Sequence, residues 1–217
     1  MRLRILSVNV GRPRIIGTVN DEPVLSGIDK RAVPQDRLFV RALNIDGDGQ
    51  ADLSVHGGVD RAVYAYSASH WPWWENEHHL PCRPASFGEN LTLEQGDETE
   101  IAIGDRFRWG DAELEVAQPR APCYKLAIHT RRGEAARLMT LSGRCGFYLR
   151  VTQEGMAPVH GAALERVHAS GAATVREAFF AVLGKAPAEA LERVLAAPGL
   201  AENWATALRR RLVALQG

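Results

Sequence analysis

The sequence predicts a mainly β protein with additional helices, in which a β-barrel or β-sandwich is followed by a small bundle of three helices. Up to about residue 168, short segments alternate apolar and polar residues and are broken by glycine, proline and aspartate. From about residue 174 the apolar spacing becomes helical, with capping residues at the helix ends. We therefore expect two domains, residues 1–170 and residues 171–217.

The strands and the first helices are predicted in chain order. Seven segments show the alternation that is typical of strands, namely residues 4–10, 37–43, 61–67, 89–94, 112–117, 146–152 and 162–169. Two helices interrupt this series. One follows Ser67 in the tryptophan-rich run SASHWPWWENEHH, and the other covers residues 133–143 and ends at Gly143.

The last part of the chain carries clear helix signals. Three amphipathic helices are expected, at residues 174–184, 187–197 and 200–216. Thr174 and Glu177 have the spacing of a capping box, which marks the start of the first helix. Pro187 is a favoured first helical residue and is expected to open the second.

Composition narrows the class of function. The 217 residues carry 26 basic and 26 acidic side chains, so the formal net charge is zero and the chain lacks the basic balance that is typical of nucleic-acid-binding proteins. No apolar run approaches the ~20 residues that span a bilayer. Three cysteines are an odd and sparse count, which is not that of a disulfide framework. We expect a cytoplasmic protein that binds neither nucleic acid nor membrane and keeps its thiols reduced.

The run QPRAPCYKL, residues 118–126, places one cysteine in an unusual setting. Cys123 follows Pro122, and Arg120 and Lys125 lie on either side of it. Cations near a thiol favour thiolate, which is both a nucleophile and a soft metal ligand. A structural role as a small apolar side chain is the alternative. Cys82 and Cys145 lack such a setting and are predicted to be structural.

The run HGGVDRAV, residues 56–63, combines a glycine pair with three different polar groups. His56, Asp60 and Arg61 surround a turn that precedes a predicted strand. This pattern suits a site for polar contacts. The plainer alternative is a loop in which Asp60 and Arg61 form an ion pair.

Two further runs are rich in turn residues. In FGENL, residues 87–91, Glu89 and Asn90 follow a glycine, which indicates either a backbone close to a ligand or turn chemistry alone. The run DGDGQADLSVHG begins like a calcium loop, but Ala51 and Gly57 stand where that loop needs glycine and glutamate. Turn geometry explains its glycines and aspartates more simply.

Taken together, these motifs resemble the MOSC family, named after the C-terminal domain of molybdenum cofactor sulfurases. The matching runs are IDGDGQADLSVHGGVDRAVYAYSASHWPWW, FGENLTL, GDRFRWGDAELEVAQPRAPCYKL and GRCGFYLRV. The pattern TVREA…LAAPGLAENW is similar to the three-helix C-terminal domain of bacterial 6-N-hydroxylaminopurine resistance proteins. The resemblance covers nearly the whole chain and implies a MOSC-type β-barrel of mixed strands.

The resemblance also implies a cofactor and its site. Cys123 would coordinate molybdenum directly, and the dithiolene of molybdopterin would supply the other equatorial sulfurs. Cys123, His56 and Asp60 are the candidate catalytic residues, with Cys123 also the metal ligand. The candidate cofactor-binding residues are Lys30, Arg61, Glu89, Asn90, Arg120 and Lys125. The cations among them suit the phosphate of the pterin.

The activity implied by the resemblance is reduction of N-hydroxylated bases and related compounds, with molybdenum cofactor as the redox group. The chain has no CxxC, iron–sulfur or flavin pattern, so we expect a separate reductase to donate electrons. A protein that carries the cofactor or its sulfur without turnover is the main alternative. A thiol-nucleophile enzyme without metal is a third. The oligomeric state is open, with a homodimer among the expected forms.

Overall fold

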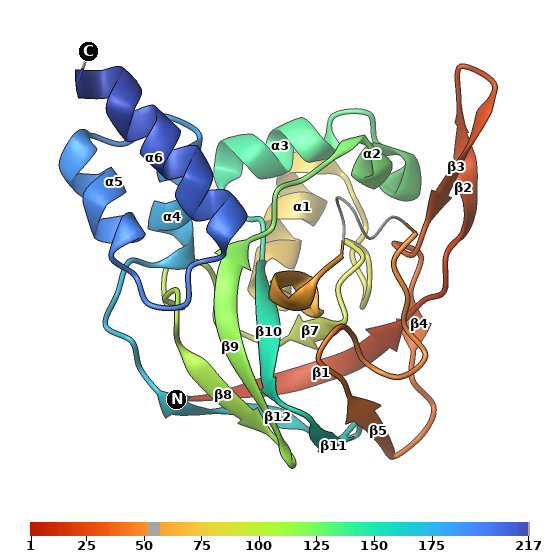
Figure 1. Ribbon diagram of the computed structural model, residues 1–217. Helices are drawn as coiled ribbons and strands as arrows, with labels where there is room; N and C mark the ends of the chain where they lie inside the picture. Colours follow the sequence, from red (N-terminus) through yellow and green to blue (C-terminus); the bar gives the residue numbers. More distant parts are fainter. Residues whose placement is uncertain (52–56, 217) are drawn as a thin grey trace.

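The computed structural model describes residues 1–51 and 57–216, and within them seven strands close into a barrel (Figure 1). The strands of the barrel are β1 (Arg2–Val10), β6 (Val63–Ser67), β7 (Leu91–Leu93), β8 (Arg106–Trp109), β9 (Ala112–Pro119), β10 (Phe147–Gln153) and β12 (Ala163–His168). Their order around the barrel is β12-β8-β9-β10-β6-β7-β1, and β1 pairs back with β12. Only β6 and β7 pair in parallel among these described strands. The predicted β-barrel is therefore confirmed.

Strand β6 shows how the barrel wall is built. Every residue of β6 is buried, although an alternating strand usually has one wet face. Val63 and Ala65 belong to the barrel core, whereas Tyr64 and Tyr66 belong to a second cluster on the outside with Trp74. Helices and loops cover that outer face, so both faces of β6 are dry.

Five short strands of the described chain lie outside this ring. Strand β4 (Arg31–Ala32) pairs with β1, and β5 (Arg37–Val40) pairs with β11 (Gly155–Pro158). Strands β2 (Arg14–Val19) and β3 (Glu22–Ser26) form a hairpin that projects from the barrel (Figure 1). The sequence analysis missed this hairpin, whose turn residues Asn20 and Asp21 both have positive φ values of 49° and 65°.

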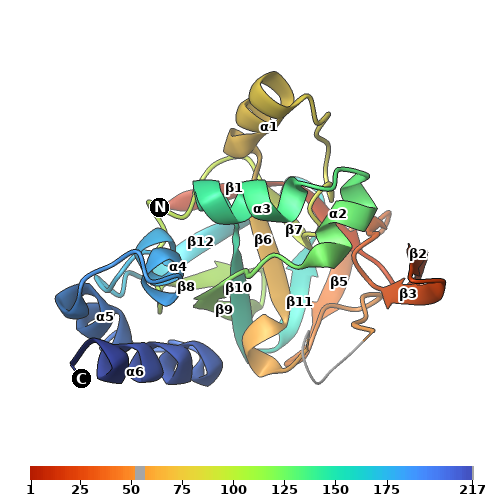
Figure 2. The ribbon, with the colours of Figure 1, turned by 90° about the horizontal axis from the view of Figure 1, so that it is seen from above.

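Three helices lie between the barrel strands in sequence. The short 3₁₀ turn η2 (Ala68–His70) leads into α1 (Trp71–His78), as expected from the tryptophan-rich run. Helix α3 (Ala135–Ser142) ends at Gly143 with φ of 69°, also as predicted. Helix α2 (Tyr124–Thr130) was not predicted. Figure 2 shows α2 and α3 across one end of the barrel.

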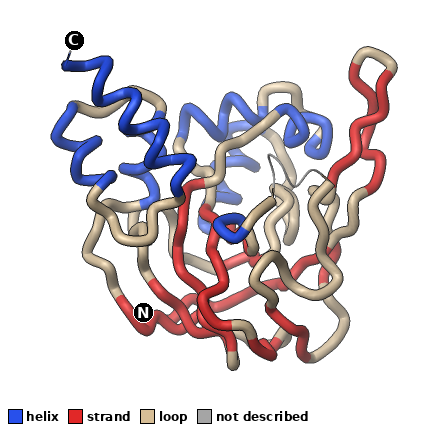
Figure 3. The backbone as a smooth tube through the Cα atoms, in the orientation of Figure 1, coloured by secondary structure: helices blue, strands red, loops and turns tan. Residues whose placement is uncertain are grey.

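The remaining helices pack against one side of the barrel, away from the β2–β3 hairpin (Figures 2 and 3). They are α4 (Val175–Val182), α5 (Ala188–Leu195) and α6 (Glu202–Gln216). One detail was wrong, because Pro187 is the N-cap of α5 rather than its first helical residue. In the described part of the chain, no helix has the length and apolarity needed to cross a membrane.

The three C-terminal helices share their apolar core with the barrel. Val175, Leu191 and Leu208 are buried in the same cluster as Leu114 of β9. The first residue of α4 also bonds to the segment that precedes β8, since the Val175 amide donates to the Ile101 carbonyl at 2.8 Å. The division at residues 170 and 171 thus remains a prediction, with continuous packing across it.

The capping box of α4 forms as predicted and allows a simple test. The Glu177 amide donates to the Thr174 hydroxyl at 3.2 Å, and the Thr174 amide donates to Glu177 Oε2 at 2.8 Å. We expect Thr174→Ala to lower the free energy of unfolding by about 1 kcal/mol, because the cap is lost. Urea denaturation measures this change in the free energy of unfolding. Thr206→Ala, at an exposed hydroxyl of α6, is the control and should change the value by less than about 0.5 kcal/mol.

Candidate active site

One cleft gathers most of the predicted site residues between the base of the β2–β3 hairpin and the start of α2. Its volume is about 710 Å³, including space open to solvent. The predicted residues that line it are Lys30, Arg61, Asn90, Arg120, Cys123 and Lys125. They come from segments that are far apart in the sequence, and the fold brings them together.

Cys123 lies where strand β9 gives way to helix α2. It is the N-cap residue of α2, with extended backbone (φ −129°, ψ 172°), and its carbonyl accepts the Leu126 amide at 3.0 Å. Pro119 ends β9 and Pro122 directly precedes the cysteine, so the connection is short and stiff. The half-buried Cys123 lines the cleft. A sulfur on a rigid turn beside a cleft suits a metal ligand or a nucleophile.

Arg120 is a buried cation in the wall of the same cleft. Only 5% of the residue is exposed. Its Nη1 donates to Met139 Sδ at 3.0 Å, and its guanidinium lies 5.5 Å from the centroid of the Tyr64 ring. Among the described residues it has no carboxylate partner. A buried cation without a counter-ion is costly, so this arrangement favours an anionic ligand.

Lys30 differs from Arg120, because a carboxylate already balances its charge. Lys30 Nζ donates to Asp48 Oδ1, and both side chains are buried. The same oxygen accepts the Gly11 amide at 2.8 Å. Burial lowers the pKa of Lys30 and Asp48 raises it, with the net effect below the ordinary value. Lys30 therefore contributes a hydrogen-bond donor to the cleft more than a net charge.

Asn90 links three segments at the floor of the cleft through hydrogen bonds of its side chain. Its Nδ2 donates to Asp48 Oδ2 at 2.9 Å and to the Asn9 carbonyl at 3.1 Å. Its Oδ1 accepts the Tyr64 amide at 3.0 Å. The side chain thus joins β1, β6 and the Asp48 turn, and the position predicted for cofactor binding also holds the cleft in shape.

Glu89 lies below the cleft and, within the described residues, is not part of its lining. It is fully buried and accepts the Ala85 amide at 2.8 Å, the Phe87 amide at 3.0 Å and the Thr92 hydroxyl at 2.8 Å. Burial raises the pKa of Glu89, while these donors act in the opposite direction. The contacts fix the loop that presents Gly88 and Asn90 to the cleft.

The two ends of the HGGVDRAV run behave differently. Arg61 lines the cleft, whereas Asp60 bonds to Arg150 of β10 at 2.8 Å and lies outside the lining described here. Both belong to the 3₁₀ turn η1 (Val59–Arg61). Adjacent side chains on a turn diverge, which explains the separation. His56, the third predicted residue, lies outside the described residues.

Lys125 connects the cleft to the hairpin. Its Nζ donates to the Leu25 carbonyl of β3 at 3.1 Å, and the residue lines the cleft next to Cys123. The first turn of α2 is thereby attached to the hairpin that forms the opposite rim.

Among the cleft residues that sequence reasoning missed, Asp48, Tyr64 and Tyr148 carry polar groups. Asp48 was assigned to turn geometry, although an aspartate in a glycine-rich turn just before the HGG run is a usable signal. Tyr64 and Tyr148 lie on β6 and β10 and line the wall around Arg120. Burial raises the pKa of Tyr148, and Arg120 acts against that rise, so the phenol stays protonated at neutral pH. Tyr64 and Tyr148 alternate with core residues along their strands, and this pattern does not show which side chains face the cleft.

Similar proteins are known by sequence. An uncharacterized Bacillus subtilis protein, YflK, is 37% identical over 97% of this chain and 95% of its own length. Protein YiiM of Escherichia coli is 37% identical over 80% of this chain and 79% of its own length. A protein named reductase from Gibberella moniliformis is 36% identical over 54% of this chain, which corresponds to 22% of that protein.

Solved structures agree with these relatives. The crystal structure of YiiM from Geobacillus stearothermophilus superposes with a TM-score of 0.80 at 31% identity, covering 97% of this chain and 99% of that one. YiiM from Escherichia coli gives 0.78 at 30% identity, covering 99% and 94%. The family model for the MOSC domain matches residues 52–165. With its barrel, its cleft and these relatives, the chain belongs to the MOSC domain family.

Proposed function

We propose that this protein is a molybdenum-cofactor-dependent oxidoreductase that reduces N-hydroxylated bases and related N-hydroxylated compounds. The observation that carries the proposal is the meeting of the Cys123 thiol and the buried Arg120 in one cleft of a MOSC domain. A soft sulfur donor suits molybdenum, and a cation without a carboxylate suits the phosphate of a pterin. The reductase named among the relatives is consistent with a redox role.

The residues present fit this cofactor. Cys123 would bind the metal through its sulfur. Arg120, Arg61 and Lys125 would balance the charge of the phosphate, because all three line the cleft. When bound, the cofactor supplies a two-electron reduction, in which R–NHOH, two electrons and two protons give R–NH₂ and water.

Other residues of the cleft would orient the substrate and place proton-carrying groups beside it. Ile28 and Phe87 provide apolar wall, which suits a flat heterocyclic base and reduces the access of water. Lys30 Nζ and the Tyr148 hydroxyl carry protons at the wall. Electrons would come from a separate reductase, since none of the recognisable redox motifs is in the sequence.

The direct test uses protein made in a host that synthesises molybdopterin. We expect about one molybdenum per chain by elemental analysis, as for a single cofactor site. With reduced methyl viologen as artificial donor, the protein should convert 6-N-hydroxylaminopurine to adenine catalytically. Protein that contains neither molybdenum nor pterin after such expression would overturn the proposal.

A cofactor carrier is the second candidate, favoured by the same cleft. It would bind molybdopterin or its sulfur and release it to an apo-enzyme, with no reduction of hydroxylamines. A thiol-nucleophile enzyme would instead show activity in metal-free protein, and alkylation of Cys123 would stop it. The molybdenum content and the turnover assay separate all three.

A further inference from the structure

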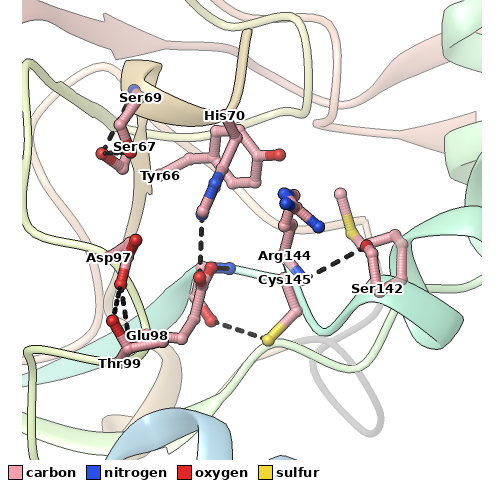
Figure 4. Close-up of polar contacts among 12 residues, drawn as sticks. Tyr66, Ser67, Ser69, His70, Asp97, Glu98, Thr99, Ser142, Arg144 and Cys145 are labelled. Atoms are coloured by element: carbon pink, nitrogen blue, oxygen red, sulfur yellow. Dashed lines mark hydrogen bonds and ion pairs between the residues drawn. The ribbon is translucent and has the colours of Figure 1, made fainter. Parts of the chain in front are cut away.

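Among the described residues, a buried histidine and a buried carboxylate contact each other outside the cleft lining and have no part in the function proposed above. His70 Nε2 and Glu98 Oε2 are 2.8 Å apart, and both side chains are almost completely buried. Figure 4 shows the two side chains pointing toward each other, with Cys145 beside them. A buried carboxylate is held in place only where donors satisfy it, so its partners indicate its role.

The other oxygen of Glu98 holds a peptide of the barrel. Glu98 Oε1 accepts the amide of Gly146, the residue just before β10. Gly146 has φ of 70°, and a Cβ at this position would come within 2.4 Å of the Ala65 carbonyl oxygen. Only glycine suits this conformation and this close packing. The orientation of the Gly146 peptide is therefore set by the carboxylate on one side and β6 on the other.

Gly146 also contacts the backbone of Arg120, which lines the cleft. The Gly146 carbonyl accepts the amide of Arg120 at 3.2 Å, one residue beyond the last pair of strands β9 and β10. Next to it, the Cys145 carbonyl accepts the Tyr64 hydroxyl at 2.8 Å, and the Arg120 guanidinium lies over that tyrosine ring. Two hydrogen bonds and one residue thus connect the buried carboxylate to the backbone of the cleft arginine.

We propose that Glu98 is a positioning residue for the anion site of the cleft, acting on Arg120 through Gly146. It touches no ligand. It fixes the point at which the chain leaves β9, so the guanidinium stays between Tyr64 and Met139 and faces the cleft. His70 holds the free end of the carboxylate in the direction that this contact needs. The inference rests on the proposed function only in taking Arg120 as an anion-binding group.

The test measures binding of inorganic phosphate by calorimetry, with no molybdenum present. Glu98→Asp keeps the charge but shortens the side chain, and it should weaken phosphate binding about tenfold, a typical coupling between connected residues. Glu98→Gln keeps the length and an acceptor for the Gly146 amide, so affinity should stay within about threefold of wild type. Asp97→Asn, at a neighbouring carboxylate that contacts only Thr99 in Figure 4, is the matched control and should change nothing.

A double-mutant cycle checks that the effect passes through Arg120. Arg120→Gln should lose most of the phosphate affinity, and adding Glu98→Asp should cost nothing further. Hydrogen exchange of the Arg120 amide should be faster in Glu98→Asp than in wild type or Glu98→Gln.

Several outcomes would overturn the inference. A purely electrostatic role predicts tighter phosphate binding in Glu98→Gln and no change in Glu98→Asp, and additive losses in the cycle would show an independent site. If Glu98→Asp does not fold, Glu98→Ala takes its place, and phosphate affinity within about threefold of wild type in that variant would overturn the inference. Wild-type protein without Arg120-dependent phosphate binding would overturn the inference whatever the molybdenum analysis gives. Conversely, protein that binds no molybdenum can still show the dependence on Glu98.

Discussion

Replacing Cys123 with serine is expected to abolish the reduction of N-hydroxylated substrates and to leave the fold intact. Serine has a similar size but offers a hard hydroxyl in place of a soft sulfur that ionises easily. Losing a partner that only supports a metal ligand costs about 10- to 100-fold in activity, so losing the ligand itself should cost more than about 100-fold. The turnover and the molybdenum content of purified Cys123→Ser measure the loss of activity and the loss of the metal.

The other two cysteines are natural controls for this experiment. Cys82 is half-buried, and burial raises its pKa to about 12, so it remains a thiol at neutral pH. Cys145 is buried beside Gly146, and its substitution also reports on tolerance of the core. Cys82→Ser should keep wild-type turnover. Unchanged turnover in Cys123→Ser would show that the sulfur is not the ligand.

Removing the carboxylate of Asp48 is expected to give the largest loss of stability at the cleft. Asp48→Ala leaves the Lys30 ammonium buried without a counter-ion and removes the acceptor of Gly11 and Asn90. Breaking a buried pair in this way costs about 3–5 kcal/mol. The free energy of unfolding from guanidinium titrations should fall by that amount.

Two matched variants show whether the unpaired charge of Lys30 is responsible for the loss of stability. Adding Lys30→Met to Asp48→Ala removes the unpaired ammonium and should recover part of the loss. Asp46 lies two residues before Asp48 and forms an exposed ion pair with Arg41. Asp46→Ala breaks that pair and should cost less than about 1 kcal/mol. If the double variant is as unstable as Asp48→Ala, the hydrogen bonds to Gly11 and Asn90 carry the energy instead.

Six of the seven barrel strands could be predicted because their alternation is strong, and the C-terminal helices because they have caps. Strand β8, which is only four residues long, was not predicted. The β2–β3 hairpin lacked both signals, since few of its residues are buried. Helix α2 was missed because the prolines before Tyr124 suggest an irregular loop, although proline before a helix also marks its start.

The site was predicted less completely than the fold, for a geometric reason. Family motifs identify which residues lie near the cleft, and Cys123 and Arg120 do line it. They do not say which way each side chain points. Asp60 turns to Arg150, and Glu89 turns to the backbone of its own loop. Asp48 shows the reverse case, since its partners Lys30, Gly11 and Asn90 lie 18, 37 and 42 residues away and no local pattern reveals them.

The pairing of β1 with β12 has a consequence for the order of events during synthesis. Arg2 lies opposite Glu165, so the first and last strands of the barrel can meet only after synthesis has reached β12. Contacts of such long sequence separation slow folding, and the ring stays open with unpaired edges on the nascent chain. A cofactor supplied from solution would therefore meet a closed barrel only after β12 has been synthesised.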